Sequence, residues 1–231
     1  MKRVVQSIIV AALLVSACSA GANVVANGGF EDGEFGDGSV REVSRGDDAL
    51  TGWTVNDNPI AWYTTGYEPN PLMPIGVGPH SGNLAINLCD GSVAHACDGS
   101  VRPVSISQTF QVLPSIEQQL SFWVGNYSGN DGTVSIGVTI TDGTSNTLLL
   151  GETAMAPATD LDSAWQEFTY SFTPIGRSNI ISFSEIGGGY YAGLDDVTVL
   201  AVPEPATWAL ALLGFAGLGM LGMRRRRLTP A

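Results

Sequence analysis

The fold is decided by a stretch that reads Val104-Ser105-Ile106-Ser107-Gln108-Thr109-Phe110-Gln111-Val112. Apolar and polar residues alternate along most of it, which is the pattern of a β-strand with one buried face. The same period of two recurs in five further sets, which are Leu120/Phe122/Val124, Val134/Ile136/Val138/Ile140, Phe168/Tyr170/Phe172, Ile181/Phe183 and Val197/Val199. Many short strands with one buried face each predict a β-sandwich.

Turn-forming residues separate these strands. They occur at Asn130-Asp131-Gly132, Asp142-Gly143, Pro174-Ile175-Gly176 and Gly187-Gly188-Gly189. Outside the two ends of the chain no apolar residues recur at the helical period of 3.6. We therefore expect an all-β domain over residues 23–202, long enough for one sizeable core.

That domain is strongly acidic. The chain has 22 acidic residues, of which only Glu204 lies outside residues 23–202, and four of its ten basic residues lie inside them (Arg41, Arg45, Arg102 and Arg177), so the formal charge of the domain is −17. Nucleic acids and anionic lipid surfaces are poor partners for such a field. Neutral glycans and divalent cations are compatible with it, and so is a role of the acidity in solubility alone.

The C-terminal end carries an uncharged run from Ala206 to Met223, followed by four arginines, Arg224, Arg225, Arg226 and Arg227. As a helix the run would span about 27 Å at about 1.5 Å per residue, close to the roughly 30 Å of a bilayer core. The arginines would mark the cytoplasmic side, and Trp208 the opposite interface. The run therefore predicts a transmembrane helix over 206–223, with a buried core helix as the alternative.

Three residues before this run, Pro203, Glu204 and Pro205, are followed by Trp208-Ala209, the rest of the apolar run and the arginine cluster. This order over residues 203–227 resembles the PEP-CTERM sorting signal of Gram-negative bacteria in its PEPxxWA form. The resemblance implies an exosortase as partner, a membrane-embedded cysteine transpeptidase that cleaves near Pro203-Glu204-Pro205. It also implies an inner-membrane intermediate, followed by export to the cell surface or beyond.

The N-terminal end has the features of a signal for export. Lys2 and Arg3 precede an apolar stretch over residues 8–15, and Ala20-Gly21-Ala22 offers small residues at a cleavage site, so residues 1–22 are expected to be a signal peptide and Asn23 the mature N-terminus. Val15-Ser16-Ala17-Cys18 also resembles a lipobox, in which Cys18 would be lipidated. Both alternatives place the domain outside the cytoplasm.

Two cysteines, Cys89 and Cys97, remain after removal of the signal peptide. In an oxidising exterior they predict a disulfide that closes a short loop, with a contribution of about 2–3 kcal/mol to stability. The alternative is a metal site that also uses His95, but only three soft ligands are present and no second C-x-x-C or H-x-x-x-H supports them.

Three segments of the domain carry a second resemblance: Asn27-Gly28-Gly29-Phe30-Glu31 with Gly52-Trp53 near the start, His80-Ser81-Gly82-Asn83 before Leu84-Ala85-Ile86-Asn87-Leu88, and Tyr190 to Val199 at the end. The first and last resemble the opening and closing strands of galactose-binding-like jelly-rolls, a fold that includes several families of carbohydrate-binding modules, and the middle one is similar to an inner segment of the same modules. The resemblance implies a jelly-roll β-sandwich and, in such modules, a structural Ca²⁺ that joins the first and last strands.

A calcium site can also be argued from the residues. Asp195 shares strand parity with Val197 and Val199, so its carboxylate would point to the apolar side, where an unpaired charge is costly. A cation with oxygen ligands would remove that cost, with Glu31 opposite and Asp196 as substitute ligand if a bulge shifts the register. The alternative is that Asp195 accepts backbone N–H groups and binds no metal.

Four aromatic residues are candidates for glycan binding. Trp123 lies between Phe122 and Val124 and so points away from their face, while Trp62, Tyr63 and Tyr67 lie in a Pro/Gly-rich segment where no pattern buries them. Flat aromatic rings stack on the C–H faces of sugars. The alternative for Trp123 is that both faces of its sheet are covered.

Catalysis has little support in the sequence. There is no G-x-S-x-G, no H-E-x-x-H and no Gly-rich phosphate loop, and residues 23–202 contain only His80 and His95 as near-neutral bases. We therefore expect a protein that is not an enzyme. It would either bind extracellular polysaccharide through the jelly-roll or serve as a structural matrix protein without a specific ligand.

Overall fold

Two antiparallel sheets make up the fold. The computed structural model describes residues 22–69, 75–90, 104–130, 132–187 and 190–202 together with Gly214, and at residues 89 and 90 only the backbone. Within these ranges the strands are β1 (Val40–Val43), β2 (Thr54–Val55), β3 (Ile60–Thr64), β4 (Leu84–Asp90), β5 (Ser105–Gln111), β6 (Gln118–Asn126), β7 (Val134–Asp142), β8 (Leu148–Ala156), β9 (Ala164–Phe172), β10 (Ser178–Gly187) and β11 (Gly193–Ala201).

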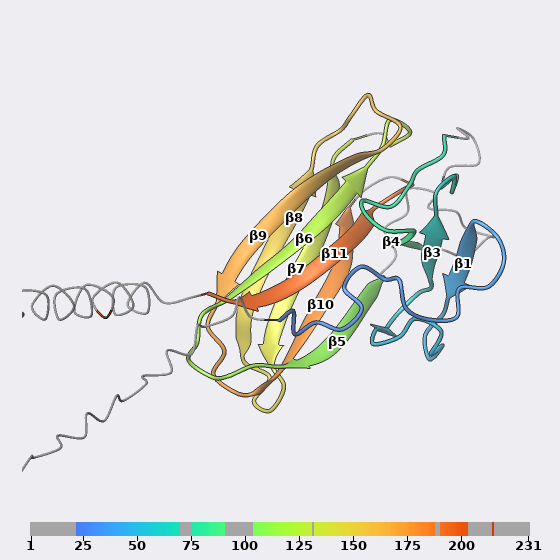
Figure 1. The fold of residues 1–231 in the computed structure, drawn as a ribbon. Helices are drawn as coiled ribbons and strands as arrows, with labels where there is room; N and C mark the ends of the chain where they lie inside the picture. Colours follow the sequence, from blue (N-terminus) through green and yellow to red (C-terminus); the bar gives the residue numbers. More distant parts are fainter. Residues whose placement is uncertain are drawn as a thin grey trace, which may run out of the picture. The chain divides into compact units, whose positions relative to one another are not determined.

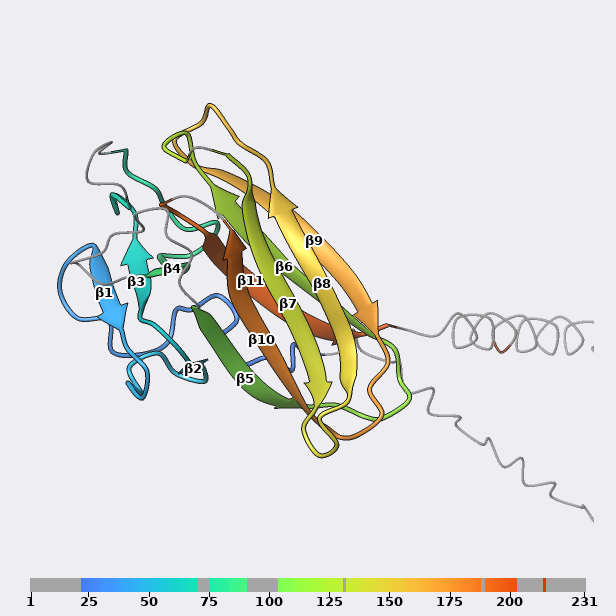
Figure 2. The ribbon, with the colours of Figure 1, turned by 180° about the vertical axis from the view of Figure 1, so that it is seen from behind.

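The strands form two layers (Figures 1 and 2). One sheet has the order β1-β3-β4-β11-β6-β9 and the other the order β2-β5-β10-β7-β8. Neighbours in the order are often far apart in sequence, as with β4 and β11, and every pairing is antiparallel. The predicted all-β jelly-roll sandwich is confirmed.

The alternating stretches form the strands that their pattern predicts. Residues 105–111 form β5, in which Ile106, Gln108 and Phe110 are buried and the residues between them are not. β6, β7, β9, β10 and β11 follow the other alternating sets. β8 was not predicted, because Glu152, which is exposed, falls in the alternation between the buried Leu150 and Ala154 and interrupts the apolar pattern.

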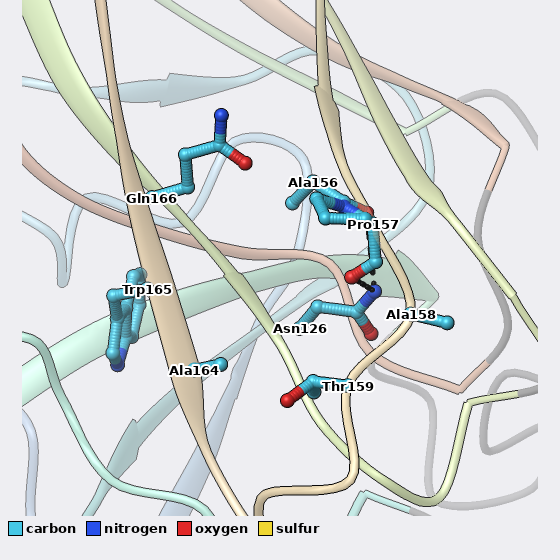
Figure 3. Close-up of a pocket in the computed structure, with 8 residues that line it drawn as sticks. All are labelled: Asn126, Ala156, Pro157, Ala158, Thr159, Ala164, Trp165 and Gln166. Atoms are coloured by element: carbon cyan, nitrogen blue, oxygen red, sulfur yellow. Dashed lines mark hydrogen bonds between the residues drawn. The ribbon is translucent and has the colours of Figure 1, made fainter.

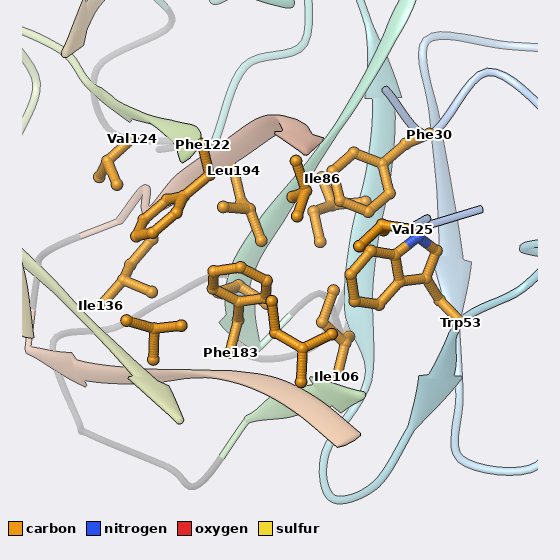
Figure 4. Close-up of a cluster of buried hydrophobic side chains, with 14 of the residues drawn as sticks. Val25, Phe30, Trp53, Ile86, Ile106, Phe122, Val124, Ile136, Phe183 and Leu194 are labelled. Atoms are coloured by element: carbon orange, nitrogen blue, oxygen red, sulfur yellow. The ribbon is translucent and has the colours of Figure 1, made fainter. Parts of the chain in front are cut away.

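The core lies between the two sheets (Figure 4). Phe122 of β6 packs edge to face on Phe183 of β10, with ring centroids 4.9 Å apart, and Phe110 of β5 meets Phe172 of β9 in the same way at 6.3 Å. Each of these pairs joins one sheet to the other. The core cluster extends from Val25 to Val199, and full burial of each large apolar side chain contributes about 1.5–3 kcal/mol.

The first described residues are tied to the last strand. The side chain of Asn23 accepts a hydrogen bond from the Val199 N–H at 2.9 Å and donates one to the Val197 carbonyl at 3.1 Å. At the end of the strand, the Val202 N–H donates to the Glu117 carbonyl at 2.9 Å. Ala22–Val202 is one compact unit that contains the entire core cluster.

The predicted signal peptide (1–22) and transmembrane helix (206–223) fall outside the described residues, apart from Ala22 and Gly214. Among the described residues, no helix is long and apolar enough to cross a membrane.

Candidate functional site

A second cluster of aromatic side chains covers the outer face of the six-stranded sheet. Because Phe122 and Val124 point into the core, Trp123 points outward, and so does Trp165, which pairs with Gly125 on the neighbouring strand. Tyr63 and Tyr191 are buried in the same cluster. We call these four residues, Tyr63, Trp123, Trp165 and Tyr191, the aromatic face.

Two glycines make room for this face. Gly125 of β6 and Gly193 of β11 are directly paired. A Cβ atom at Gly125 would lie 2.7 Å from the Tyr191 hydroxyl and 3.1 Å from the Trp165 ring, and one at Gly193 would overlap the same two side chains. Any larger residue at either position would lift Tyr191 and Trp165 off the sheet.

Trp165 is half-buried and lies at the edge of this face, on β9. It meets Tyr191 edge to face, with ring centroids 6.4 Å apart, and His80 at 5.8 Å. Beside it lies an open depression of about 310 Å³ lined by Asn126, Ala156, Pro157, Ala158, Thr159, Ala164, Trp165 and Gln166. Figure 3 shows Trp165, Ala164 and Gln166 along β9, with Pro157, Ala158 and Thr159 on the neighbouring segment.

The wall of the depression is held in place by Asn126. Its side-chain amide donates to the Pro157 carbonyl at 2.7 Å and to the Ala156 carbonyl at 3.1 Å. Its Oδ1 accepts a hydrogen bond from the Asn130 amide at 2.6 Å, and Oδ1 of Asn130 in turn accepts the N–H groups of Tyr190 and Tyr191. The depression and the buried ring of Tyr191 are therefore fixed by one hydrogen-bond network.

Trp123 has one side of its ring covered. The imidazole of His80 is stacked on it, with centroids 3.7 Å apart and an interplanar angle of 15°. Trp123 is half-buried as a result. Of the two tryptophans on the aromatic face, Trp165 has no ring stacked parallel to it among the described residues.

The segment that contains His80 is held by hydrogen bonds to three carboxylates, those of Asp195 and Asp196 and, at its other end, that of Glu31. Oδ2 of Asp195 accepts the His80 N–H at 2.9 Å and the Ser81 N–H at 3.1 Å, and Oδ1 accepts the N–H of Asp196 at 2.7 Å. Asp196 contacts the His80 imidazole Nδ1 at 2.7 Å and accepts the Ser81 hydroxyl at 2.8 Å. These bonds fix the position of the His80 ring over Trp123.

Glu31 holds the other end of the same segment. Its Oε1 accepts the N–H groups of Asn83 at 2.7 Å and Leu84 at 2.9 Å. Gly82, directly before Asn83, has a φ of +61°, and a Cβ atom there would overlap the Glu31 carboxylate. Only glycine fits this backbone without strain.

The expected parity of Asp195 was wrong. The register of β11 against β6 shifts between Asp195 and Thr198, so Asp195 pairs with Trp123 and lies on the aromatic face, while Val197 and Val199 remain in the core. This bulge adds one residue, and Asp196 within it has a φ of +50°. Asp195 is nonetheless fully buried, and burial raises its pKa to about 7, although the N–H bonds from Ser81, Asp196 and His80 oppose the shift.

Two of the three carboxylates proposed for calcium already have backbone donors in this geometry. Both oxygens of Asp195 and Oε1 of Glu31 are occupied by backbone N–H groups. Among the described residues, no three His, Cys, Asp or Glu side chains are grouped so that they could hold a metal. The geometry is that of the alternative, in which Asp195 accepts backbone N–H groups. Calcium between Glu31, Asp195 and Asp196 stays a prediction.

Two of the proposed glycan-binding aromatics lie in the interior. Trp62 and Tyr63 belong to β3 and are fully buried. Trp62 faces the main core and donates its indole N–H to the Phe30 carbonyl at 2.9 Å, while the Tyr63 and Tyr191 hydroxyls are 2.6 Å apart. The expectation that they are loop residues open to a sugar was wrong, because β3 is covered on both faces.

Tyr67 and Trp123 are half-buried. Tyr67 packs against Tyr63 with ring centroids 5.0 Å apart. The pattern did not single out Trp165, yet its position three residues before Phe168 gives it the opposite parity to the core residues of β9. The reasoning applied to Trp123 would have found it.

The cysteine prediction lies outside the described residues. Cys97 and His95 fall in the range 91–103, and of Cys89 only the backbone is described. The disulfide between Cys89 and Cys97 therefore stays a prediction.

Comparison with known sequences confirms the resemblance to the sorting motif. Residues 201–227 match the PEP-CTERM protein-sorting motif, which begins at the last residue of β11. Four features inferred above, namely Pro203-Glu204-Pro205, Trp208, the apolar run and Arg224 to Arg227, all fall within this match. No curated protein matches the chain.

Similar solved structures include three carbohydrate-binding modules. TmCBM61, solved in complex with β-1,4-galactotriose, is 19% identical with a TM-score of 0.47 over 78% of this chain and 99% of that one. CBM4 is 20% identical with a TM-score of 0.40 over 77% and 99%. CBM35 from Paenibacillus barcinonensis is 17% identical with a TM-score of 0.40 over 71% and 100%. At these identities and TM-scores, the likeness says nothing about a ligand for this chain.

Proposed function

We propose that this protein is an exported, non-enzymatic glycan-binding protein whose site is the aromatic face around Trp165. The observation that carries the proposal is a half-buried tryptophan beside an open depression, on a sheet face that is otherwise closed by aromatic packing. Tyr191 and His80 meet the Trp165 ring at steep angles, and neither is stacked parallel to it.

A sugar ring suits this environment. Its C–H groups would stack on the indole, while its hydroxyls would meet the polar rim, to which Thr159 contributes at the border of the depression. Glu167 is exposed on the same strand and face as Trp165 and adds a carboxylate acceptor. The asymmetry between an apolar flat surface and a polar rim favours a carbohydrate over a purely apolar ligand.

The charge of the domain narrows the class of glycan. With a formal charge of −17 over residues 23–202, an anionic polysaccharide would be repelled. A neutral extracellular polysaccharide approaches without that penalty. We therefore propose a neutral glycan as the ligand.

A glycan array on the fragment 23–202 tests this proposal. We expect binding to one or more neutral glycans, and Trp165→Ala should weaken it about tenfold or more, as expected for loss of a central aromatic contact. The matched control is Met155→Ala, which removes an exposed apolar side chain on the other sheet. If no glycan binds, the structural matrix role becomes the better account. Equal losses in the two variants would show that the site lies elsewhere.

Sorting by an exosortase is the second part of the proposal. The PEP-CTERM match supports an inner-membrane intermediate held through residues 206–223, followed by processing near Pro203-Glu204-Pro205 and release to the cell surface or the extracellular matrix. The domain would then arrive outside without its apolar tail.

Mass spectrometry of the exported protein from its native host checks the processing. We expect a mature chain that begins at Asn23 and ends near Pro203 to Pro205, since these two ends lie at the boundaries of the compact unit, Ala22–Val202. A lipidated N-terminus at Cys18 would replace the first of these ends. A C-terminus at Ala231 in the surface-exposed protein would refute processing.

A further inference from the structure

Two buried oxygen atoms without hydrogen-bond partners lie on neighbouring strands, away from the aromatic face. They are Oδ2 of Asp142, at the end of β7, and Oδ1 of Asn179, at the start of β10. Asp142 is 3% exposed and Asn179 fully buried. The two residues are direct partners in the sheet register, so their side chains share one face and have Cβ atoms about 4.5–5.5 Å apart.

The hydrogen bonds around Asp142 and Asn179 show which of their oxygen atoms have no donor. Oδ1 of Asp142 accepts the N–H and hydroxyl of Ser145 at 2.7 and 2.8 Å and the N–H of Thr144 at 3.1 Å. The Asn179 amide group donates to the Gly176 and Arg177 carbonyls at 3.2 Å each. Turning the Asn179 amide over would set its oxygen against those two carbonyls, so the oxygen is fixed as the free acceptor.

The carboxylate also lacks a compensating positive charge. The N–H and hydroxyl of Ser145 hold the pKa of Asp142 below its usual value, so the group is ionised at neutral pH. Among the described residues the ion pairs are Arg41 with Asp47 and His80 with Asp196, and neither involves Asp142. A buried anion with one oxygen free of donors is costly unless a cation or a donor approaches it.

We propose that Asp142 Oδ2 and Asn179 Oδ1 are ligands of a hard divalent cation, Ca²⁺ in an extracellular setting. Carboxylate and amide oxygens are the ligands that Ca²⁺ takes, with backbone carbonyls and water completing its shell. Gly176 is required at the site, because a Cβ atom there would overlap Oδ2 of Asp142. The ion would join the β7–β8 turn to the β9–β10 turn. The carboxylates near the first and last strands, in contrast, already have backbone donors.

Calorimetric titration of the fragment 23–202 with CaCl₂, combined with melting in Ca²⁺ and in EDTA, tests this site. We expect millimolar or tighter binding and a melting temperature several degrees higher in Ca²⁺, since a ligand of the native state stabilises it. Asp142→Asn keeps Oδ1 for the turn and should abolish both effects. Asp195→Asn, the matched control, should retain them.

A second variant keeps the test open if Asp142→Asn does not fold. Asn179→Asp adds a carboxylate to the pair and should lower the Ca²⁺ concentration at half-saturation several-fold. Three results would overturn the proposal. The first is a wild type that neither binds Ca²⁺ nor melts at a higher temperature in it, which would leave a bridging water between the two oxygens. The others are a Ca²⁺ effect that is lost in Asp195→Asn but kept in Asp142→Asn, and an unchanged Ca²⁺ concentration at half-saturation in Asn179→Asp.

Discussion

Replacing Trp62 by alanine should lower the free energy of unfolding by about 3–5 kcal/mol, the usual cost of deleting a buried large aromatic side chain. Trp62 is fully buried, packs edge to face on Phe35 with centroids 5.1 Å apart, and bonds to the Phe30 carbonyl. The change therefore leaves a cavity and an unpaired carbonyl. Urea denaturation monitored by circular dichroism measures the loss.

The control for this substitution is Trp165→Ala. It removes the same side chain from a half-buried position, so it should cost clearly less stability than Trp62→Ala. If the two variants lose equal stability, Trp165 is a core residue, and its role in the proposed site fails with it. A Trp62→Ala protein as stable as the wild type would contradict the placement of β3.

Asp195→Ala should destabilise the domain by about 2–4 kcal/mol at neutral pH. The substitution removes the acceptor of three part-buried N–H groups, those of His80, Ser81 and Asp196. A fully buried group left unpaired costs about 1–3 kcal/mol, and partial access to water lowers that cost for each of the three. Part of that cost is offset, because the wild-type carboxylate is itself penalised by burial. Asp160→Ala, at an exposed carboxylate, is the control and should change stability by less than about 0.5 kcal/mol.

A second readout distinguishes local from global effects of Asp195→Ala. The stack of His80 on Trp123 depends on the segment that Asp195 holds, so the Trp123 indole signal in an NMR spectrum should shift. An unchanged stability together with an unchanged Trp123 signal would contradict the structural role of Asp195.

Period-two alternation was sufficient for the strands that bury one face against the core. It predicted β5, β6, β7, β9, β10 and β11, because each places apolar residues inward at every second position. It was insufficient for β3, in which Ile60, Ala61, Trp62 and Tyr63 are all buried. A strand covered on both faces has no alternation to detect.

The site was harder to predict than the fold because it depends on departures from regular geometry. The bulge at Asp195 and Asp196 moved a carboxylate from the expected core side to the aromatic face, and no local pattern announces such an insertion. The partners of Glu31, the N–H groups of Asn83 and Leu84, lie some fifty residues away in the sequence. The sorting motif could be predicted from the sequence alone, because it consists of neighbouring residues in a fixed order with defined chemistry.

The central claim is that a neutral glycan stacks on Trp165, and indole NMR tests it most directly. Trp53, Trp62, Trp123 and Trp165 are the tryptophans of the fragment 23–202, and each gives one indole N–H signal. During titration with the glycan that binds best on the array, the Trp165 signal should move most, while the signals of the buried Trp53 and Trp62 stay in place. A saturating titration that leaves the Trp165 signal unmoved would contradict the account.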